Sequence, residues 1–517
     1  MTFEIVFVLL SLLGMVAALI ADKMRPGMIL FSVVVLFLCA GILTPKEMLE
    51  GFSNKGMITV ALLFLVSEGI RQSGTLGQVI KKLLPQGKTT VFKAQLRILP
   101  SVAFISAFLN NTPVVVIFAP IIKHWAKSVN LPATKFLIPL SYVTILGGIC
   151  TLIGTSTNLV VHGMILEAGF EGFSMFELGK VGIFIAIAGI IYIFLFSKRL
   201  LPDARPDTAV PDEEVEEGEK VHRVEAVLGA RFPGINKKLK DFNFQRHYGA
   251  EVKEIKTRNG QRFVSNLEEV VLHEGDTLVV MADDTFIPTW GESSVFVLLT
   301  NGNEPDTTGK KKRWFALLLL VLMIVGATVG ELPVTKEMFP DIKLDMFFFV
   351  SITTIIMAWT NLFPARKYTK YISWDILITI ACAFAISKAM VNSGVADSVA
   401  KFIIGLSDDY GPHVLLAMVF IITNLFTELI TNNAAAALAF PLALSISAQL
   451  GVSPTPFFVV ICMAASASFS TPIGYQTNLI VQGIGNYKFT DFVRIGLPLN
   501  IITFLISIIL IPLIWNF

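Results

Sequence analysis

The sequence predicts an α-helical polytopic membrane protein whose two halves have inverted topology and flank a small soluble α+β domain. The first observation is composition: 54% of the 517 residues are hydrophobic, 15% are charged and the mean hydropathy is +0.70, far from a soluble enzyme of this length. The second is charge distribution, because residues 198–313 contain 18 of the 41 basic and 21 of the 39 acidic residues. The third is a sequence repeat at a nearly constant spacing.

Ten apolar runs are long enough to cross a bilayer, which takes roughly 17–25 residues. The runs are 4–20, 27–43, 56–74, 135–167, 176–197, 314–331, 344–361, 372–391, 456–487 and 492–514. The charged segment between the fifth and the sixth run is predicted to be soluble. The formal net charge of +2 provides no basic excess for a phosphate backbone, so nucleic acid is excluded as the main partner.

Two further apolar stretches, 91–127 and 412–450, are interrupted by Asn110-Asn111-Thr112-Pro113 and by Thr431-Asn432-Asn433. Irregular polar backbone survives at membrane depth only where protein or a water-filled cavity satisfies it, so both stretches are predicted to be re-entrant hairpins. Short loops rich in Lys and Arg all fall on one side, which the positive-inside rule places in the cytoplasm. Both termini are then outside, the soluble segment is inside, the first hairpin opens to the cytoplasm and the second opens to the exterior.

The two halves of the sequence match at three separate places. The matching pairs are 153–163 with 473–483 and Ser73-Gly74 with Ser393-Gly394, at an offset of 320, and 111–120 with 432–441, at an offset of 321. Each membrane repeat, 1–200 and 314–517, carries five crossings and one hairpin. Because five is odd, the second copy is predicted to lie upside down relative to the first. Inverted repeats are typical of secondary transporters with a binding site near the bilayer midplane.

Each half therefore contains two interruptions, a hairpin tip and an unwound turn, which together give four free helix ends near the bilayer centre. Free N-termini present unpaired N–H groups and a positive dipole end, so they attract an anion without a fixed cation. Asn111 and Thr112 are natural capping residues, and Pro113 is predicted to be the first residue of the new helix. Unwound carbonyls and asparagine oxygens at the same tips suit a hard monovalent cation such as sodium.

Glu68, Lys388 and Glu428 are among the charged residues of the apolar stretches, where a charge costs at least about 2.5–3.5 kcal/mol. Glu68 and Lys388 are related by the offset of 320 and have opposite signs, so they are predicted to pair or to extend to opposite interfaces. Glu428 precedes Asn432 by four residues and is predicted to lie near the second hairpin tip.

The central soluble segment is predicted to be a small α+β domain between two linkers. Its parts are an acidic linker at 201–219, the domain at 220–300 and a basic linker at 301–313. The predicted strands are Val221–Leu228, Ala250–Thr257 and Thr277–Ala282. A short helix is predicted around Ile235–Leu239. The domain has no Walker loop, no GxGxxG motif and no Ser/His/Asp arrangement, so no enzyme activity is predicted and a dimerising or regulatory role is expected.

The hairpins carry the motifs NNTP and TNNAAAALAFP, which are followed by IGTSTN and IGYQTN. These motifs resemble the divalent-anion/sodium symporter family (DASS), specifically its sulfate-transporter branch, and the resemblance covers essentially the whole chain. Arg231, Gly234, Arg258-Asn259-Gly260 and Gly275-Asp276 resemble a TrkA-C (RCK_C) domain, an insertion typical of that branch. The resemblance implies a homodimer of elevator type, in which the hairpins and broken helices move as a transport domain against a fixed scaffold.

The resemblance also implies two kinds of site residue. The implied sodium ligands are Ser106, Asn110, Asn111 and Gly154 in one half and Thr427, Asn432 and Gly474 in the other. The implied substrate contacts are Asn110, Asn111, Thr112, Thr155, Thr431, Asn432, Asn433, Gly474 and Tyr475. The usual Ser-Asn-Thr motif is altered in both hairpins, and Tyr475-Gln476 replaces a common threonine-proline pair, so dicarboxylate specificity is not transferred.

The predicted function is sodium-coupled symport of sulfate or a related divalent oxyanion across the cell membrane, with two sodium sites and a cytoplasmic TrkA-C domain. The nearest alternative has the same fold and transports a dicarboxylate. A different class is an ion channel regulated by the TrkA-C domain, against which the missing TVGYG-type filter argues. A third class, a receptor for a nucleotide such as cyclic di-AMP, rests only on the insert.

Overall fold

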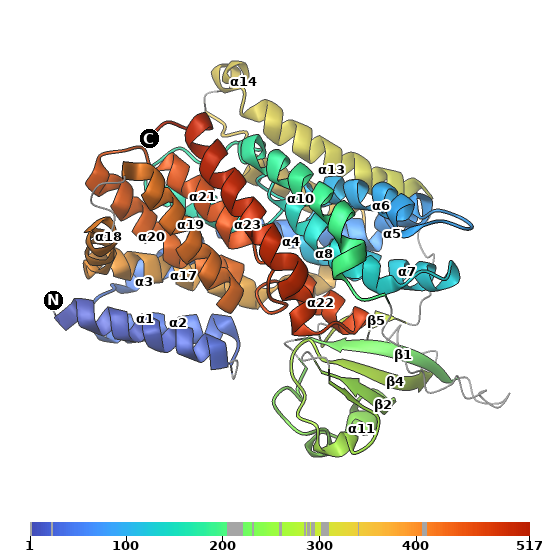
Figure 1. The fold of residues 1–517 in the computed structure, drawn as a ribbon. Helices are drawn as coiled ribbons and strands as arrows, with labels where there is room; N and C mark the ends of the chain where they lie inside the picture. Colours follow the sequence, from blue (N-terminus) through green and yellow to red (C-terminus); the bar gives the residue numbers. More distant parts are fainter. Residues whose placement is uncertain are drawn as a thin grey trace.

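The computed structural model describes residues 3–21, 24–203, 221–229, 232–257, 261–283, 286, 290, 295–300, 310–339, 341–405 and 411–517. Within these residues the protein is mostly helical and has one small sheet (Figure 1). Several sequence predictions lie outside the described residues. They are the acidic linker from 204 to 219, Arg231, Arg258-Asn259-Gly260 and the basic linker from 301 to 309.

The helices follow the predicted apolar runs, and two of the runs are divided. The first half contains α1 (Phe3–Ala21), α2 (Pro26–Cys39), α3 (Pro45–Glu50), α4 (Lys55–Gln72), α5 (Thr75–Leu83), α6 (Val91–Ser106), α7 (Asn111–Ser128), α8 (Leu137–Gly148), α9 (Ser156–Glu167) and α10 (Gly179–Leu200). The second half contains α13 (Lys310–Gly330), α14 (Pro333–Met338), α15 (Met346–Trp359), α16 (Tyr368–Tyr371), α17 (Trp374–Asn392), α18 (Val395–Gly405), α19 (Gly411–Leu429), α20 (Asn432–Leu450), α21 (Thr455–Ser466), α22 (Gln476–Gly485) and α23 (Phe489–Ile514).

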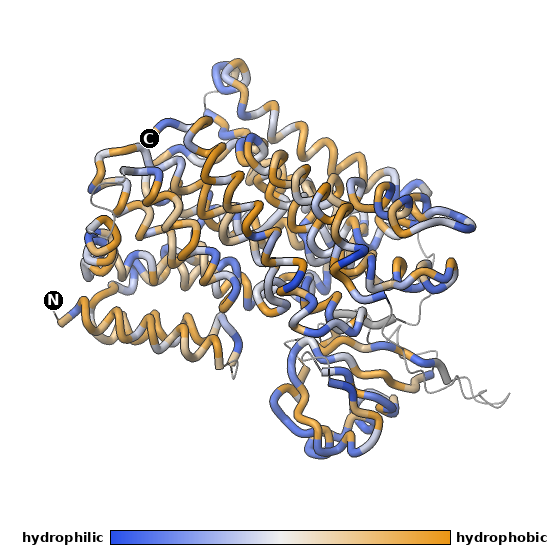
Figure 2. Tube along the Cα trace, viewed as in Figure 1, coloured by the Kyte–Doolittle hydropathy of each residue, from blue (hydrophilic) through white to orange (hydrophobic). Residues whose placement is uncertain are grey.

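Helix length and composition are those of a multi-pass membrane protein. Among the described residues, eight helical segments are long and apolar enough to cross a membrane, and four shorter apolar helices accompany them. Figure 2 shows hydrophobic residues along these helices, with hydrophilic residues concentrated at helix ends and in the small sheet domain. The predicted class of polytopic helical membrane protein is therefore confirmed.

The repeated Ser-Gly pair forms the same turn twice. Gly74 lies between α4 and α5 at φ +69°, and Gly394 lies between α17 and α18 at φ +76°. This left-handed backbone favours glycine at both positions. Ser73 Oγ donates to the carbonyl of Ile70 (2.6 Å), and Ser393 Oγ donates to that of Ala389 (2.7 Å), so each serine satisfies a carbonyl in the last turn of the preceding helix.

The predicted interruptions are present as breaks between consecutive helices. The breaks are 107–110, 149–155, 430–431 and 467–475. Asn158 Nδ2 donates to the carbonyl of Thr151 (2.9 Å), and Asn478 Nδ2 donates to the carbonyl of Thr471 (3.1 Å), 320 residues later. The Thr-Asn ending of both motifs thus satisfies the same unpaired backbone group in each of the two longer breaks.

The inserted segment forms a five-stranded antiparallel sheet in the order β3-β2-β4-β1-β5. The strands are β1 (Val221–Leu228), β2 (Glu251–Lys256), β3 (Arg262–Phe263), β4 (Thr277–Asp283) and β5 (Phe296–Thr300). Strand residues such as Val224, Ala226 and Leu278 pack on an aromatic core of their own that includes Phe232 and Tyr248. One face of the sheet is thereby covered, as the alternation along the strands requires.

The predicted short helix of the insert is misplaced. Asn236 adopts φ +60°, which ends regular helix within the predicted range Ile235–Leu239. The helix is α11 (Phe244–Tyr248), whose N-cap Asn243 accepts a hydrogen bond from the N–H of Arg246 (2.9 Å).

The other face of the sheet packs against the membrane helices. Lys123 Nζ on α7 donates to both carboxylate oxygens of Glu225 on β1 (3.0 and 2.9 Å). At the start of β4, Thr277 lies so close to Gly483 of α22 that a Cβ on this glycine would be 2.5 Å from the threonine hydroxyl. The insert therefore contacts α7 and α22 directly, below α22 in the view of Figure 1.

Candidate functional site

Four helices, α7, α9, α20 and α22, begin inside the protein at the interruptions. Their N-cap residues are Asn110, Thr155, Thr431 and Tyr475. None of these side chains bonds to the first N–H groups of its own helix. At α7, α9 and α22 such N–H groups are available to an anion, whereas at α20 the N–H of Asn433 donates to Asn432 Oδ1 (3.0 Å). The helix dipole favours negative charge at all four starts. The prediction for the start of α7 was wrong in detail, because this helix begins at Asn111 and Pro113 is its third residue.

The fully buried side chain of Asn111 is the centre of the first half of the site. One end of its amide lies 2.8 Å from Ser106 Oγ, 3.1 Å from the carbonyl oxygen of Thr144 and 3.2 Å from that of Gly154. With the amide oxygen at this end, four oxygens face one another. Hard cations take oxygen ligands at about 2.3–2.6 Å, which places neighbouring ligands roughly 3–3.5 Å apart. This group therefore fits a cation such as sodium.

The oxygen and nitrogen of the Asn111 amide can be exchanged without moving any other atom. With the nitrogen towards Ser106, Thr144 and Gly154, the amide donates to the carbonyls of Thr144 and Gly154, and its oxygen accepts from the Tyr475 hydroxyl. Hydrogen bonds within the protein favour this assignment, whereas a cation bound at the Ser106 end would require the amide oxygen there.

Tyr475 joins the two halves of the protein at this point. Its hydroxyl lies 2.6 Å from Asn111 Nδ2 and 2.9 Å from Thr155 Oγ1, and the Asn432 side chain also hydrogen-bonds it. Its partners are thus the first residues of α7 and α20 and the N-cap residue of α9. The ring is buried, and its hydroxyl lies where the interrupted helices converge.

The tip of the second hairpin packs on the start of α9. Asn433 Oδ1 accepts hydrogen bonds from Ser156 Oγ (3.2 Å) and Thr157 Oγ1 (3.3 Å). Asn432 Nδ2 donates to Thr157 Oγ1 (2.7 Å). Both asparagines of this hairpin therefore contact the opposite half of the chain.

The second group of predicted sodium ligands is brought together only in part. Gly474 lies directly against the carbonyl of Thr427 and the hydroxyl of Ser468, and an added Cβ would collide with both. The Thr427 hydroxyl donates to the carbonyl of Ala465 (2.6 Å). Asn432, however, directs its amide nitrogen to Thr157 instead, so this oxygen group is assembled without the Asn432 amide.

The remaining predicted residues lie at the edge of the site. Thr112 is half-buried and donates to Gln476 Oε1 on α22 (3.3 Å). Thr431 is also half-buried, and its hydroxyl makes no hydrogen bond with the described residues. Asn110 lines a small cavity together with Ser156 and otherwise apolar residues such as Phe108 and Met323, and this cavity has room for about one water.

Five polar residues of the site were not predicted from the sequence. They are Thr144, Ser156, Thr157, Ser468 and Gln476. Three of them lie within the repeated motifs IGTSTN and IGYQTN, so the repeat could have identified them as site residues. Thr144 and Ser468 lie outside any motif; Thr144 contributes a backbone carbonyl, which leaves no signature in a sequence.

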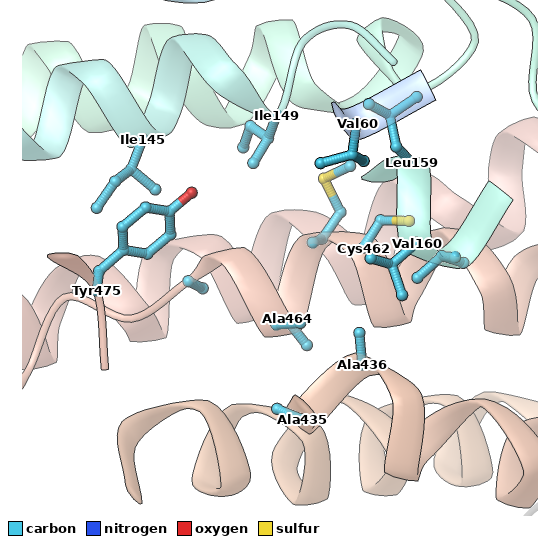
Figure 3. Packing of buried hydrophobic residues seen from close by; sticks show 14 of the residues in the cluster. Val60, Ile145, Ile149, Leu159, Val160, Ala435, Ala436, Cys462, Ala464 and Tyr475 are labelled. Carbon is cyan, nitrogen blue, oxygen red and sulfur yellow. The ribbon is translucent and has the colours of Figure 1, made fainter. Parts of the chain in front are cut away.

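Buried apolar side chains surround the site (Figure 3). Ile145 and Ile149 of α8 lie near the Tyr475 ring, and Ala435 and Ala436 of α20 face the neighbouring helices with small side chains. An environment with few competing polar groups strengthens the interaction of an ion with helix dipoles and amides.

Glu68 and Lys388 do not form a pair, which was one of the two predicted arrangements. Glu68 bonds instead to Arg71, three residues away, with both carboxylate oxygens at 2.7 Å, while Lys388 is exposed. A partner one helical turn away is nearer than a residue related only by the repeat. Glu428 accepts hydrogen bonds from the N–H of Ser470 (2.9 Å) and from Asn500 Nδ2 (2.7 Å), directly before the second hairpin tip.

A multi-pass helical membrane protein whose polar groups converge at interrupted helices has the architecture of a secondary transporter. Comparison with known families agrees: residues 16–449 and 342–516 match the family model described as Citrate transporter (CitMHS). The chain belongs to this family of anion transporters. The resemblance that the motifs predicted is confirmed at this level, whereas the family model does not identify the inserted TrkA-C domain.

Individual relatives agree with this assignment. The chain is 30% identical to an uncharacterized transporter of Synechocystis, over 94% of this chain and 93% of that protein. It is 25% identical to an uncharacterized transporter of Escherichia coli, over 99% and 100%. It is 31% identical to sodium/sulfate cotransporter 2 of Chlamydomonas reinhardtii, over 54% of this chain and 31% of that protein.

Proposed function

We propose that the protein is a sodium-coupled symporter of sulfate or a related divalent oxyanion. The observation that carries the proposal is the position of Asn111. One end of its amide belongs to the oxygen group that suits sodium, and the other end faces Tyr475 where the helix N-termini converge. The relative named as a sodium/sulfate cotransporter supports the same pair of ions.

The position of Asn111 between the two ions supplies a coupling mechanism. Sodium among Ser106, Thr144 and Gly154 binds the amide oxygen at one end, so the amide N–H groups at the other end point to the anion. Each ion thereby raises the affinity of the protein for the other ion, as reciprocal coupling requires.

The proposal includes the finer architecture predicted from the sequence. The halves 1–200 and 314–517 are inverted repeats of a homodimeric elevator transporter, and Thr427, Gly474 and Asn432 form a second sodium site in another conformation. Residues 220–300 form a cytoplasmic TrkA-C domain, for which a nucleotide such as cyclic di-AMP is a candidate ligand. Calorimetric titration of the purified full chain with cyclic di-AMP tests that ligand, and absence of heat removes it.

A second candidate is a symporter of a dicarboxylate or citrate with the same fold. The description of the matching family model favours a carboxylate. The altered hairpin motifs and the tight packing around Tyr475 favour a compact anion. Competition between the two kinds of anion distinguishes these candidates.

The deciding experiment is uptake of radiolabelled sulfate into proteoliposomes, with and without an inward sodium gradient. Succinate, citrate, thiosulfate and molybdate serve as unlabelled competitors. We expect sodium-dependent accumulation that the oxyanions block, and loss of uptake in Asn111→Ala and Asn432→Ala. Asn392→Ala, at the exposed end of α17, is the matched control. Succinate uptake without sulfate uptake would replace the oxyanion by the carboxylate, and unchanged uptake in both site variants would refute the site.

A further inference from the structure

The hydroxyl of Tyr475 occupies the position where a bound anion would meet the helix N-termini. Its neighbours Asn111 and Thr155 belong to α7 and to the N-cap of α9, at 2.6 and 2.9 Å. The ring is 7% exposed and extends from the segment before α22 towards Ile145 and Ile149 of α8 (Figure 3). A single side chain therefore fills the space between the two halves.

The repeat shows that the fold does not require this ring. The residue 320 positions earlier is Thr155, and both residues are N-caps with the same backbone, at φ −137° and ψ 146° for the threonine and φ −137° and ψ 130° for the tyrosine. A threonine is sufficient for this turn. The tyrosine thus differs from its counterpart only by what its side chain adds to the site, an aromatic ring that brings a hydroxyl to the centre.

The space around the ring is filled. The Tyr475 side chain is 7% exposed, and its partners Asn111 and Thr155 are 0% and 1% exposed. A buried site that is packed in this way leaves no room for the second charged group of a longer anion. An anion that is too large to be held between the helix N-termini must displace the Tyr475 ring.

We propose that Tyr475 is the size filter of the transporter. Its ring closes the part of the site that a second carboxylate would occupy, and its hydroxyl hydrogen-bonds the compact anion that fits. This inference rests on the proposed transport of oxyanions and adds the residue that selects them. Tyr475 sets specificity because its ring sterically excludes longer anions, whereas the N–H groups attract any anion that fits.

The test measures the ratio between the half-inhibitory concentrations of succinate and thiosulfate for sodium-driven sulfate uptake. In Tyr475→Ala we expect this ratio to fall by about tenfold or more, because removal of the ring admits the longer anion. In Tyr475→Phe we expect the ratio to persist while the sulfate affinity weakens roughly 2- to 10-fold through loss of one hydrogen bond. Tyr192→Phe, whose hydroxyl donates to the Ile495 carbonyl away from the site (3.0 Å), is the control.

The outcomes separate the filter from the proposed function. Wild-type sulfate uptake with an unchanged ratio in Tyr475→Ala overturns the filter alone. Wild-type uptake of succinate at the rate of sulfate overturns the filter and the proposed substrate together. If Tyr475→Ala does not transport, Tyr475→Thr, which copies the other half, is tested by thermal stabilisation in detergent. Stabilisation of this variant by succinate supports the filter, and stabilisation by sulfate alone overturns it.

Discussion

The attachment of the inserted domain depends on a buried charge cluster that a single substitution breaks. Glu225 lies between Lys123 Nζ of α7 (2.9 Å) and Lys256 Nζ of β2 (3.4 Å), with 16% of its side chain exposed. Burial raises the pKa of Glu225, but the two lysines outweigh burial and lower the pKa from its ordinary 4.5 to about 2. A difference of this size corresponds to about 3 kcal/mol in favour of the charged form, of which only the part due to Lys123 depends on docking, because Lys256 and Arg223 belong to the insert itself.

Lys123→Met removes the larger of the two lysine contributions. We expect the attachment to weaken by about 1–2 kcal/mol, a factor of roughly 5–30 in the docking equilibrium. Because Lys123 lowers the pKa of Glu225 in the docked form, its stabilisation is complete above pH 4.5 and is lost as the pH falls towards 2. The substitution should therefore have its full effect at pH 7.

Hydrogen exchange of residues 221–229 and 476–485 measures the attachment. We expect faster exchange in Lys123→Met and Glu225→Gln, and no further increase in the double variant, because both remove the same pair. Lys127→Met, an exposed lysine one turn along α7, is the matched control. Equal exchange in the Lys123 and Lys127 variants, or fully additive effects in the double variant, would refute the reasoning.

Two further predictions concern the site. Gly154→Ala should abolish sodium-dependent uptake, because the new Cβ would lie 2.5 Å from the carbonyl oxygen of Gly148. In the control Gly14→Ala the new Cβ meets no atom within 4 Å, so this variant should transport normally. Normal uptake in Gly154→Ala would contradict the close packing. Glu428→Ala leaves the N–H of Ser470 without its acceptor and removes one of the two acceptors of Asn500 Nδ2, which also donates to Ser470 Oγ (2.9 Å). Thermal unfolding should therefore show a loss of about 1–3 kcal/mol for the buried N–H. Glu428→Gln retains an acceptor and should lose less, and equal losses would show that the charge itself matters.

The helices and their interruptions could be predicted from the sequence because the signals are local. Polar residues such as Asn111 and Asn432 are tolerated at membrane depth only where protein or water satisfies them, so inside apolar stretches they indicate a break in the helix. The motif repeat also identified equivalent turns, such as those at Gly74 and Gly394. Periodicity did not distinguish the first helical residue of α7, since cap positions depend on backbone geometry within one or two residues.

The contacts between the halves could not be predicted in the same way. Asn111 and Tyr475 are 364 positions apart, and only the packing of α7 against α22 brings them together. The pairing predicted for Glu68 and Lys388 failed for a related reason. Equivalent positions in a repeat share an environment, but they need not touch, and Arg71 lies within reach on the same helix.

The position of the insert limits what it can regulate. Lys123 follows Asn111 by 12 positions along α7, about 18 Å along the helix axis, so one helix links the insert to the oxygen group. Similarly, α22 begins directly after Tyr475 and packs against the insert at Gly483. A ligand of the insert shifts the equilibrium between the docked and undocked forms only by the difference in its affinity for these two forms. If its effect acts through the Lys123 pair, that effect cannot exceed the strength of the pair, which is roughly 5- to 30-fold in the populations.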